Sequence, residues 1–388
     1  MRRRLFVLVA AVILLDTAFY SAITPLLPGY ADDLGLSKSS AGILSASYAA
    51  GTLIAALPSG WLAARIGFRP AMLVGLGLIG ASSLAFAFAT SIVLLDVARF
   101  AEGVGGACAW TGGLAWLLAV APDDRRGEMV GSALAAAILG ILLGPVIGAL
   151  ATLVGTEVVF TVVAAVAIGL AIWVSRTAGA PIPARPRIAE VARAIATRPV
   201  LFAFWLVVLP SMLAGAFSVL VPLHLDRLGA TGVAVGAVFF ASAAIEAFIS
   251  PGIGRLSDRR GRIVPIRAGL AASIVATLLL PVPETVVLVA IALVVTVLTM
   301  SLIWTPAMAL LSERAEDAGL DLAFGTALVS LAWAGGQVVG GSGVARLADA
   351  TSDPAGYALI AALFGLSLAA LGARSFRRAE PAPAAAAD

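Results

Sequence analysis

The feature that most constrains this chain is a series of long apolar runs separated by short polar loops. A helix needs about 20 mostly apolar residues to cross the roughly 30 Å hydrocarbon core of a bilayer. Runs of this length therefore predict membrane-spanning helices. We predict twelve spans, at residues 5–29, 39–63, 71–89, 91–118, 127–153, 157–175, 200–225, 231–257, 262–282, 284–312, 321–348 and 354–376.

The composition indicates a polytopic membrane protein and argues against several other classes. Of the 388 residues, 61% are hydrophobic and 12% are charged, and that charged share is about half of what a soluble domain carries. Cys108 and His224 are the only residues of their types, so the sequence offers no metal cluster and no supported Ser-His-Asp set. It also lacks a P-loop. We expect no enzyme, no metal and no cofactor.

The basic residues predict the orientation of the spans. Of the 25 lysines and arginines, 21 fall on the side that carries the N-terminus, whereas Lys38, Arg227 and Arg346 fall on the other side and Arg99 lies within a span. Basic loops are typically cytoplasmic, so both termini are expected in the cytoplasm and the chain in a plasma or inner membrane. The run from Leu5 is too long for a cleaved signal peptide, and we interpret it as a retained span.

The loops divide the chain into two halves. The one long connection, residues 176–199, contains five arginines and four prolines. We interpret it as a cytoplasmic linker between two six-helix bundles, at residues 1–175 and 200–378. The Pro/Ala-rich residues 379–388 are predicted to be a disordered tail.

Two motifs recur in both halves at nearly the same spacing. Residues 60–67 (GWLAARIG), after the second span, match residues 254–261 (GRLSDRRG), after the eighth, at an offset of 194. The glycine pattern at 140–148 in the fifth span matches 336–343 in the eleventh at an offset of 196. Two matches at nearly one offset indicate a parallel duplication, which is a transporter architecture. The predicted fold is therefore all-α, with twelve membrane-spanning helices in two pseudo-symmetric six-helix bundles.

Acidic residues are predicted to lie deep in the membrane. Asp16 is eleven residues past Leu5, or ~16 Å along a helix, close to the bilayer midplane. Glu102 lies at a similar depth, eleven residues past Ser91. A charge at this depth costs about 2.5–3.5 kcal/mol on insertion scales, usually faces protein or water, and is a functional candidate. Tyr20 lies one turn from Asp16 on the same helix face. A structural ion pair is the alternative interpretation.

The loop after the eighth span carries a resemblance to a known family. Residues 254–262 read GRLSDRRGR, which is similar to the signature of the major facilitator superfamily and implies the major facilitator fold for nearly the whole chain. The resemblance implies that Asp258 accepts from helix N-terminal donors or an arginine of a neighbouring span and latches one conformation; arginines that only anchor the topology are the alternative. The first copy has Ala64 where the family usually has aspartate. The expected latch residues are Gly60, Arg65, Gly67, Arg69, Gly254, Asp258, Arg259, Gly261 and Arg262.

Two further motifs resemble those of this family. Arg99-x3-Gly103-x3-Ala107 is similar to its intramembrane arginine motif, which implies that Arg99 transfers protons or polarises a carboxylate. Asp96 or Glu102 can pair with Arg99 along the helix, and a pair that only fixes packing is the alternative. The fifth span resembles the motif associated with exporters of the family, with residues Gly140, Gly144, Pro145 and Gly148.

The first span, LLDTAFYSAITPLLPGY, resembles that of the 12-span drug:proton antiporters and vesicular amine transporters. The resemblance implies that Asp16 meets a cationic substrate or the proton. Tryptophans of other spans are candidate cation–π walls, although a single Trp more often faces lipid or packs. Glu246, in the eighth span, is a further acid with a structural role as the alternative. The candidate substrate and proton residues are Asp16, Tyr20, Arg99, Glu102, Glu246, Trp110, Trp304 and Trp333.

These features predict a secondary active transporter that exports small amphipathic or cationic compounds in exchange for protons, by alternating access. The expected partners are a small-molecule substrate, protons and the lipid bilayer, with no nucleic acid, and the chain is expected to be a monomer. One alternative is an importer or facilitator of a sugar or organic acid, but the lack of Asn and the single Gln disfavour a sugar site. A non-transporting membrane sensor or a membrane-embedded enzyme is less favoured.

Overall fold

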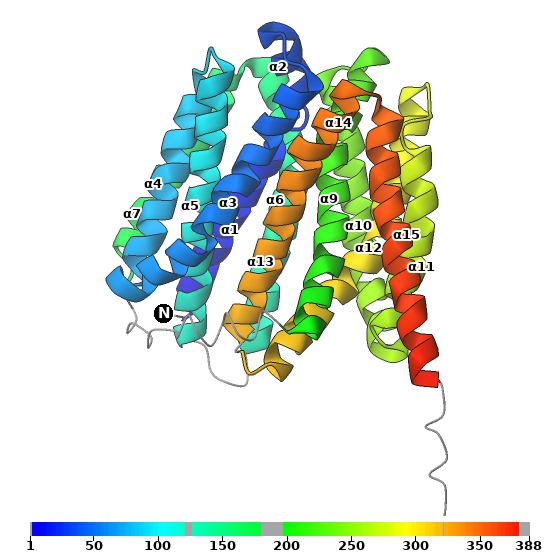
Figure 1. Cartoon of the computed structure of the whole chain (residues 1–388). Helices are drawn as coiled ribbons and strands as arrows, with labels where there is room; N and C mark the ends of the chain where they lie inside the picture. Colours follow the sequence, from blue (N-terminus) through cyan, green and yellow to red (C-terminus); the bar gives the residue numbers. More distant parts are fainter. Residues whose placement is uncertain (1, 121–125, 180–196, 321, 380–388) are drawn as a thin grey trace, which may run out of the picture.

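The apolar runs form a bundle of long helices, which confirms the predicted all-α fold (Figure 1). The computed structural model describes residues 2–120, 126–179, 197–320 and 322–379. Residues 180–196 of the predicted linker and 380–388 of the predicted tail lie outside these ranges. The elements are α1 (Arg2–Ala22), α2 (Leu27–Leu34), α3 (Lys38–Ile66), α4 (Phe68–Ala87), α5 (Ile92–Val120), α6 (Arg126–Val154), α7 (Thr156–Ser175), α9 (Arg198–Arg227), α10 (Gly232–Arg260), α11 (Ile263–Leu279), α12 (Val286–Asp317), α13 (Leu322–Val338), η2 (Val339–Val344), α14 (Ala345–Ala350) and α15 (Asp353–Ala379).

The predicted spans all appear as helices, and one of them is short. Within the described ranges, eleven helices are long and apolar enough to cross a membrane, and α11 adds a shorter apolar helix of 17 residues. It corresponds to the predicted span 262–282. Pro281, which has no backbone N–H to continue the helix, directly follows the C-cap at Leu280. Apolar side chains such as Phe248, 92% exposed, cover the outside of the bundle.

The first predicted span is broken near its end. α1 stops at Ala22, the chain turns, and α2 begins at Leu27. Pro25 cannot donate a backbone hydrogen bond, and its ring would meet the carbonyl four residues earlier. Pro28 lies in the first turn of α2, where backbone N–H groups have no partner within the helix, so the missing N–H of proline costs no hydrogen bond. The break places Asp16 in the last two turns of α1, and it leaves carbonyl oxygens at the end of that helix without helical partners.

The eleventh span also departs from a regular helix. It passes through the π-helical turn η2, which accommodates an extra residue and shifts the register of the residues after the turn. A Cβ at Gly340 would meet the backbone of Met212 on α9, whereas a Cβ at Gly341 would lie 3.3 Å from Ala46 of α3. Gly343 makes no close approach to another helix. The match predicted between residues 140–148 and 336–343 is therefore incomplete at its third glycine.

Two groups of helices face each other along the bundle. α1 and α3–α7 pack mainly on one another, as do α9–α13 and α15. They meet through α3 against α13, η2 and α14, and through α6 against α10. α1 begins and α15 ends at the same end of the bundle, the lower end in Figure 1, as an even number of spans requires. The division into bundles at 1–175 and 200–378 stays a prediction.

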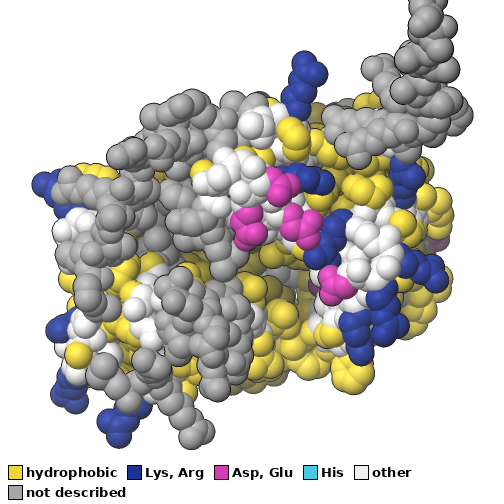
Figure 2. Space-filling model, turned by 90° about the horizontal axis from the view of Figure 1, so that it is seen from below, with side chains coloured by type: hydrophobic (Ala, Val, Ile, Leu, Met, Phe, Trp, Pro, Cys, Tyr) yellow, Lys and Arg dark blue, Asp and Glu magenta, His cyan; other side chains and the backbone are white. Residues whose placement is uncertain are grey.

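The two ends of the bundle differ. Figure 2 views the lower end of Figure 1 and shows several Lys or Arg side chains there, so we call it the basic end. At the opposite end, Lys38 Nζ of α3 lies 2.5 Å from Asp353 Oδ1 of α15. Deeper in, Ser45 Oγ of α3 lies 3.3 Å from Ser218 Oγ of α9. These polar contacts join the two groups of helices on the side away from the basic end.

The repeated loop motif has the same backbone conformation in both groups. Gly67 is the C-cap of α3, with φ 96° and ψ 163°, and Gly261 is the C-cap of α10, with φ 80° and ψ 156°. Positive φ is unfavourable for residues with a Cβ and open to glycine. Each glycine therefore allows one long helix to stop and another to begin within about two residues, and this shared backbone conformation supports the predicted duplication.

Candidate functional site

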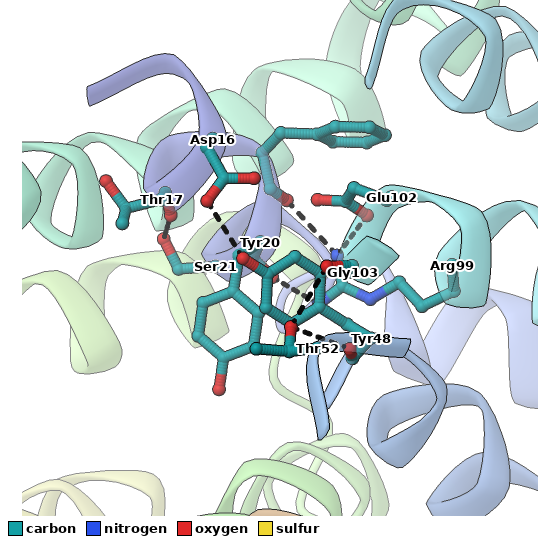
Figure 3. Close-up of polar contacts among 10 residues, drawn as sticks. Asp16, Thr17, Tyr20, Ser21, Tyr48, Thr52, Arg99, Glu102 and Gly103 are labelled. Carbon is teal, nitrogen blue, oxygen red and sulfur yellow. Dashed lines mark hydrogen bonds and ion pairs between the residues drawn. The ribbon is translucent and has the colours of Figure 1, made fainter. Parts of the chain in front are cut away.

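Asp16 is fully buried where α1 meets α3 and α5, with 0% of its surface exposed. Its Oδ2 accepts a hydrogen bond from the Tyr48 hydroxyl at 2.9 Å (Figure 3) and another from the Trp110 indole N–H at 2.9 Å. Oδ1 is also buried and has no hydrogen-bond partner among the described residues. Both neutral donors therefore act on the same carboxylate oxygen.

Arg99 and Glu102 form a buried ion pair one turn apart on α5. Arg99 Nη1 lies 2.8 Å from Glu102 Oε2, and the two side chains are 1% and 0% exposed. The arginine also donates to the backbone carbonyls of Phe19 and Tyr20, near the broken end of α1. It thus links α5 to α1 (Figure 3). Of the two acids that the sequence allowed as partners, the structure selects Glu102, while Oδ1 of Asp96 is buried without a hydrogen bond.

Aromatic rings surround the guanidinium and reach across the two groups of helices. Arg99 Cζ lies 5.2 Å from the ring centroids of both Tyr20 and Tyr48, and those centroids are 4.7 Å apart. Trp333 of α13 packs edge-on to them, with centroid distances of 5.6 Å and 6.2 Å. Ring faces attract cations, and here the tyrosine faces hold Arg99. The cluster thus combines two acids and an arginine with aromatic rings from both groups of helices.

The glycine motif of α6 holds the helix that carries Asp16. A Cβ at Gly140 would lie 2.6 Å from the Leu14 carbonyl oxygen, and one at Gly144 would lie 2.7 Å from the Ala18 carbonyl oxygen. Gly148 faces α1 in the same way one turn later. Small residues four apart let helices approach closely. The motif therefore sets the position of α1 against α6, whereas a role in antiport stays a prediction.

Glycines of α5 make room for the buried carboxylate. A Cβ at Gly106 would lie 2.7 Å from Asp16 Oδ1 and 2.8 Å from the Tyr48 hydroxyl. One turn away, the Thr52 hydroxyl of α3 donates to the Gly103 carbonyl at 3.2 Å and lies 3.1 Å from the Tyr48 carbonyl. Any larger residue at position 106 would displace the carboxylate or the hydroxyl that binds it.

Two of the predicted site residues lie elsewhere. Glu246 of α10 accepts a hydrogen bond from the Ser301 hydroxyl of α12 at 2.7 Å. Trp304 of α12 packs, half-buried, against the hydrophobic core. No described contact joins either side chain to Asp16, so Glu246 and Trp304 form no part of this cluster. The structure brings together the remaining candidates: Asp16, Tyr20, Arg99, Glu102, Trp110 and Trp333.

The predicted latch loop forms an ion-pair network inside the second group. Arg262 pairs with Asp258 and, at 2.8 Å, with Glu313 at the end of α12. Burial disfavours the charge of Arg262, but hydrogen bonds to Glu313 and Asp258 outweigh it and raise the pKa of the guanidinium. In the first copy, Arg65 instead lies 5.0 Å from the ring centroid of Trp61. The described network ties α10, α11 and α12 together, and a latch between the two groups stays a prediction.

Close packing does not account for two of the latch glycines. A Cβ at Gly60 or at Gly254 would meet no atom within 4 Å. Of the remaining arginines of the two motifs, Arg69 lies in the first turn of α4, and Arg259 lines an open hollow with Arg255 and Arg260. These arginines fit the alternative in which the loops anchor the topology.

Sequence reasoning missed Tyr48, the residue that joins the acid to the arginine. A depth argument would have found it, since Tyr48 is ten residues into α3, or ~15 Å from its start at Lys38. The same arithmetic that selected Asp16 thus applies to a phenol. Gly106 could not be found in this way, because its role depends on which side chain lies opposite.

Known proteins share this architecture. A bacterial homolog of the human lysosomal transporter Spinster, in an inward-facing and unoccupied conformation, has a TM-score of 0.76 at 15% identity over 99% of both chains. A D-xylose-proton symporter has a TM-score of 0.73 at 15% identity, over 94% of this chain and 96% of that one. These likenesses concern the fold alone.

Curated relatives match shorter segments. The probable vesicular acetylcholine transporter-B of Danio rerio is 34% identical over 143 residues, covering 34% of this chain and 29% of the relative. The synaptic vesicular amine transporter of Homo sapiens is 34% identical over 115 residues, covering 29% and 22%. The matches thus span less than a third of either relative.

The family assignment comes from a match over most of the chain. Residues 9–341 match the family model of the Major Facilitator Superfamily. This match agrees with the helical bundle, the repeated loops and the solved structures of similar fold. This is a family of multi-pass membrane transporters, not of enzymes. The chain belongs to the major facilitator superfamily.

Proposed function

We propose that this transporter exports small amphipathic cations in exchange for protons, with Asp16 as the residue that binds either one. The observation that carries the proposal is the buried carboxylate with one unpartnered oxygen, held between α1, α3 and α5 beside the tyrosine rings that Trp333 of the other group contacts. A buried ionisable residue of this kind in a membrane protein marks a functional site by default. The amines named in the relatives are consistent with this substrate class.

The contacts suggest how one site can serve two ions. A cationic head group beside Asp16 Oδ1 would offset the cost of the buried charge, and the rings of Tyr20, Tyr48 and Trp333 would cover its apolar body. Protonation of the carboxylate removes the attraction and releases the cation. Binding and release on different sides require the groups to rock about this site.

The orientation forms part of the proposal. With the basic end in the cytoplasm, the opposite end of the bundle, where the Lys38–Asp353 ion pair joins the two groups of helices, faces outward. Opening that end requires this ion pair and the contact of Trp333 with the tyrosines to break. We place the protein in the plasma or inner membrane as a monomer.

Transport in proteoliposomes tests the proposal. Vesicles with an acidic interior are diluted into neutral buffer containing ethidium and, in separate samples, other monovalent aromatic cations. We expect cation uptake that nigericin abolishes by collapsing the pH gradient. If protein-containing vesicles take up none of these cations faster than empty ones, the proposal fails.

The alternative, transport of a sugar or organic acid, has less support. Within the described ranges the one side-chain amide is Gln337, 8% exposed on α13, and a sugar site needs several neutral hydrogen-bonding groups. The likeness to the xylose symporter extends only to the fold. Counterflow of labelled xylose and lactate in the same vesicles would favour the alternative, and we expect none.

A further inference from the structure

The buried charges around Asp16 do not balance by themselves. The cluster contains two acids, Asp16 and Glu102, and one base, Arg99, and each is at most 1% exposed. The guanidinium stays protonated in proteins, and Glu102 binds it directly at 2.8 Å. With both acids ionised, the cluster would carry one net negative charge away from water. An uncompensated buried charge costs several kcal/mol.

Neighbouring helices do not supply the missing positive charge. Apart from Arg99 and Glu102, the described residues that they present to this part of α1 are uncharged: Tyr48 from α3, Phe86 from α4, Trp110 from α5, Gly140 and Gly144 from α6, Phe160 from α7 and Trp333 from α13. Asp96, one turn from Arg99, makes no described ion pair with it, and its Oδ1 is buried without a hydrogen bond, so we do not count it in the cluster. Glu246 lies with Ser301 in the other group. The cluster is thus neutral when Asp16 holds one proton or one monovalent cation.

We infer that the site exchanges one proton for one monovalent cation, so that export of such a cation moves no net charge across the membrane. This inference rests on the proposed function. When the cation binds on one side, the proton on Asp16 leaves to the solvent on that side. On the other side a proton binds and the cation leaves. One positive charge travels each way, and the pH gradient drives the exchange without help from the membrane potential.

Glu102 has a separate part in this scheme, as a positioning residue. By neutralising Arg99, it prevents the arginine from serving as the counter-ion of Asp16. In Glu102→Gln the remaining charges, Arg99 and Asp16, already balance, so the empty site has no need of a cation. In the double variant Arg99→Gln/Glu102→Gln, Asp16 is again one acid without a counter-ion. Adding Arg99→Gln should therefore restore the cation affinity that Glu102→Gln removes.

Proton release on binding measures the exchange ratio directly. Ethidium is titrated into the purified protein by calorimetry, in buffers of different ionisation enthalpy and over a pH series. We expect the number of protons released per bound ethidium to reach a maximum of one. Glu102→Gln should bind ethidium at least about tenfold more weakly, which corresponds to about 1.4 kcal/mol, and the double variant should recover most of that loss.

The outcomes separate the two proposals. If the wild-type protein binds and exchanges no monovalent cation, the proposed function fails and the ratio fails with it. If it binds ethidium but releases two protons or none throughout the pH series, only the one-for-one exchange is overturned. A double variant that folds and binds no better than Glu102→Gln also overturns it. In vesicles, a potassium diffusion potential set with valinomycin should leave the rate of ethidium exchange unchanged, and a rate that follows the potential contradicts the inference.

Discussion

Tyr48→Phe tests whether the hydrogen bond to Asp16 sets the cation affinity of the site. The substitution removes the donor at 2.9 Å from Oδ2 and keeps the ring that packs on Arg99 and Trp333. A hydrogen bond to a charged group contributes about 1.5–3 kcal/mol. Because Trp110 remains as a second donor, we take the lower value, about 1.5 kcal/mol, or roughly a tenfold weaker affinity.

The same change should move the pH dependence of binding. Removing the donor destabilises the ionised carboxylate relative to its protonated form, so cation binding requires a higher pH. A change of about 1.5 kcal/mol displaces the binding curve by roughly one pH unit upward. Fluorescence titration with ethidium over a pH series measures both effects. Tyr30→Phe is the matched control, because the Tyr30 hydroxyl is buried without a hydrogen bond, away from Asp16. Unchanged affinity and an unchanged curve in Tyr48→Phe would refute the reasoning.

Three further predictions concern the rest of the molecule. Gly144→Ala should lower the melting temperature in detergent, because its Cβ would overlap α1 and overpacking costs about 1–3 kcal/mol. Gly169→Ala is the control and should leave the melting temperature unchanged, because a Cβ there meets nothing within 4 Å. Equal melting temperatures of the two variants would contradict the packing of α1 on α6. The second prediction uses a Ser45→Cys reporter in a Cys108→Ser background, labelled by an impermeant maleimide added outside. Lys38→Met should raise the labelling rate of this cysteine by roughly fivefold or less, because such ion pairs contribute up to about 1 kcal/mol. Arg227→Met, which removes a pair within one group, should raise it less, and the reverse order would contradict the closed outer end. Glu313→Gln should lower the free energy of unfolding by less than about 1 kcal/mol, because Arg262 still forms its ion pair with Asp258. A larger loss, measured by denaturant titration, would contradict the weak contribution expected of surface ion pairs.

The architecture could be predicted from the sequence because lipid leaves few choices. Runs of about 20 apolar residues must form helices in a bilayer, and the described helices follow the predicted spans closely. The break after Ala22 and the π-helical turn η2 were not predicted. Pro25 is a local indication of the break after Ala22. The π-helical turn depends on how Gly340 and Gly341 pack against α9 and α3, which no local sequence pattern shows.

The site could be predicted in part. Depth along a helix identified Asp16 and Glu102, because burying an acid in a membrane is costly wherever it occurs. Which acids share a cluster depends on how the helices rotate against one another. The sequence therefore placed Glu246 on the same footing as Glu102, although the structure puts Glu246 with Ser301 in the other group. Tyr48 was missed because a phenol carries no charge penalty that draws attention to it.

The latch prediction shows a different limit. The motif allowed Asp258 two kinds of partner, helix N-terminal donors or an arginine of a neighbouring span, and in the structure Asp258 pairs with Arg262 of its own loop. Whether such a loop holds the two groups of helices together depends on contacts across their boundary. The first copy, where Ala64 replaces a carboxylate, cannot repeat the pair and shows Arg65 over Trp61 instead.

The most direct test of the central claim compares wild type with Asp16→Asn in uptake of ethidium driven by a pH gradient. Asparagine keeps the shape of the side chain and an oxygen that can accept from Tyr48 and Trp110, but it can neither ionise nor carry the proton. Asp33→Asn, which removes an exposed acid on α2, serves as the control. We predict accumulation by the wild type and the control and none by Asp16→Asn. Accumulation by Asp16→Asn at the wild-type rate would show that another group couples the two fluxes.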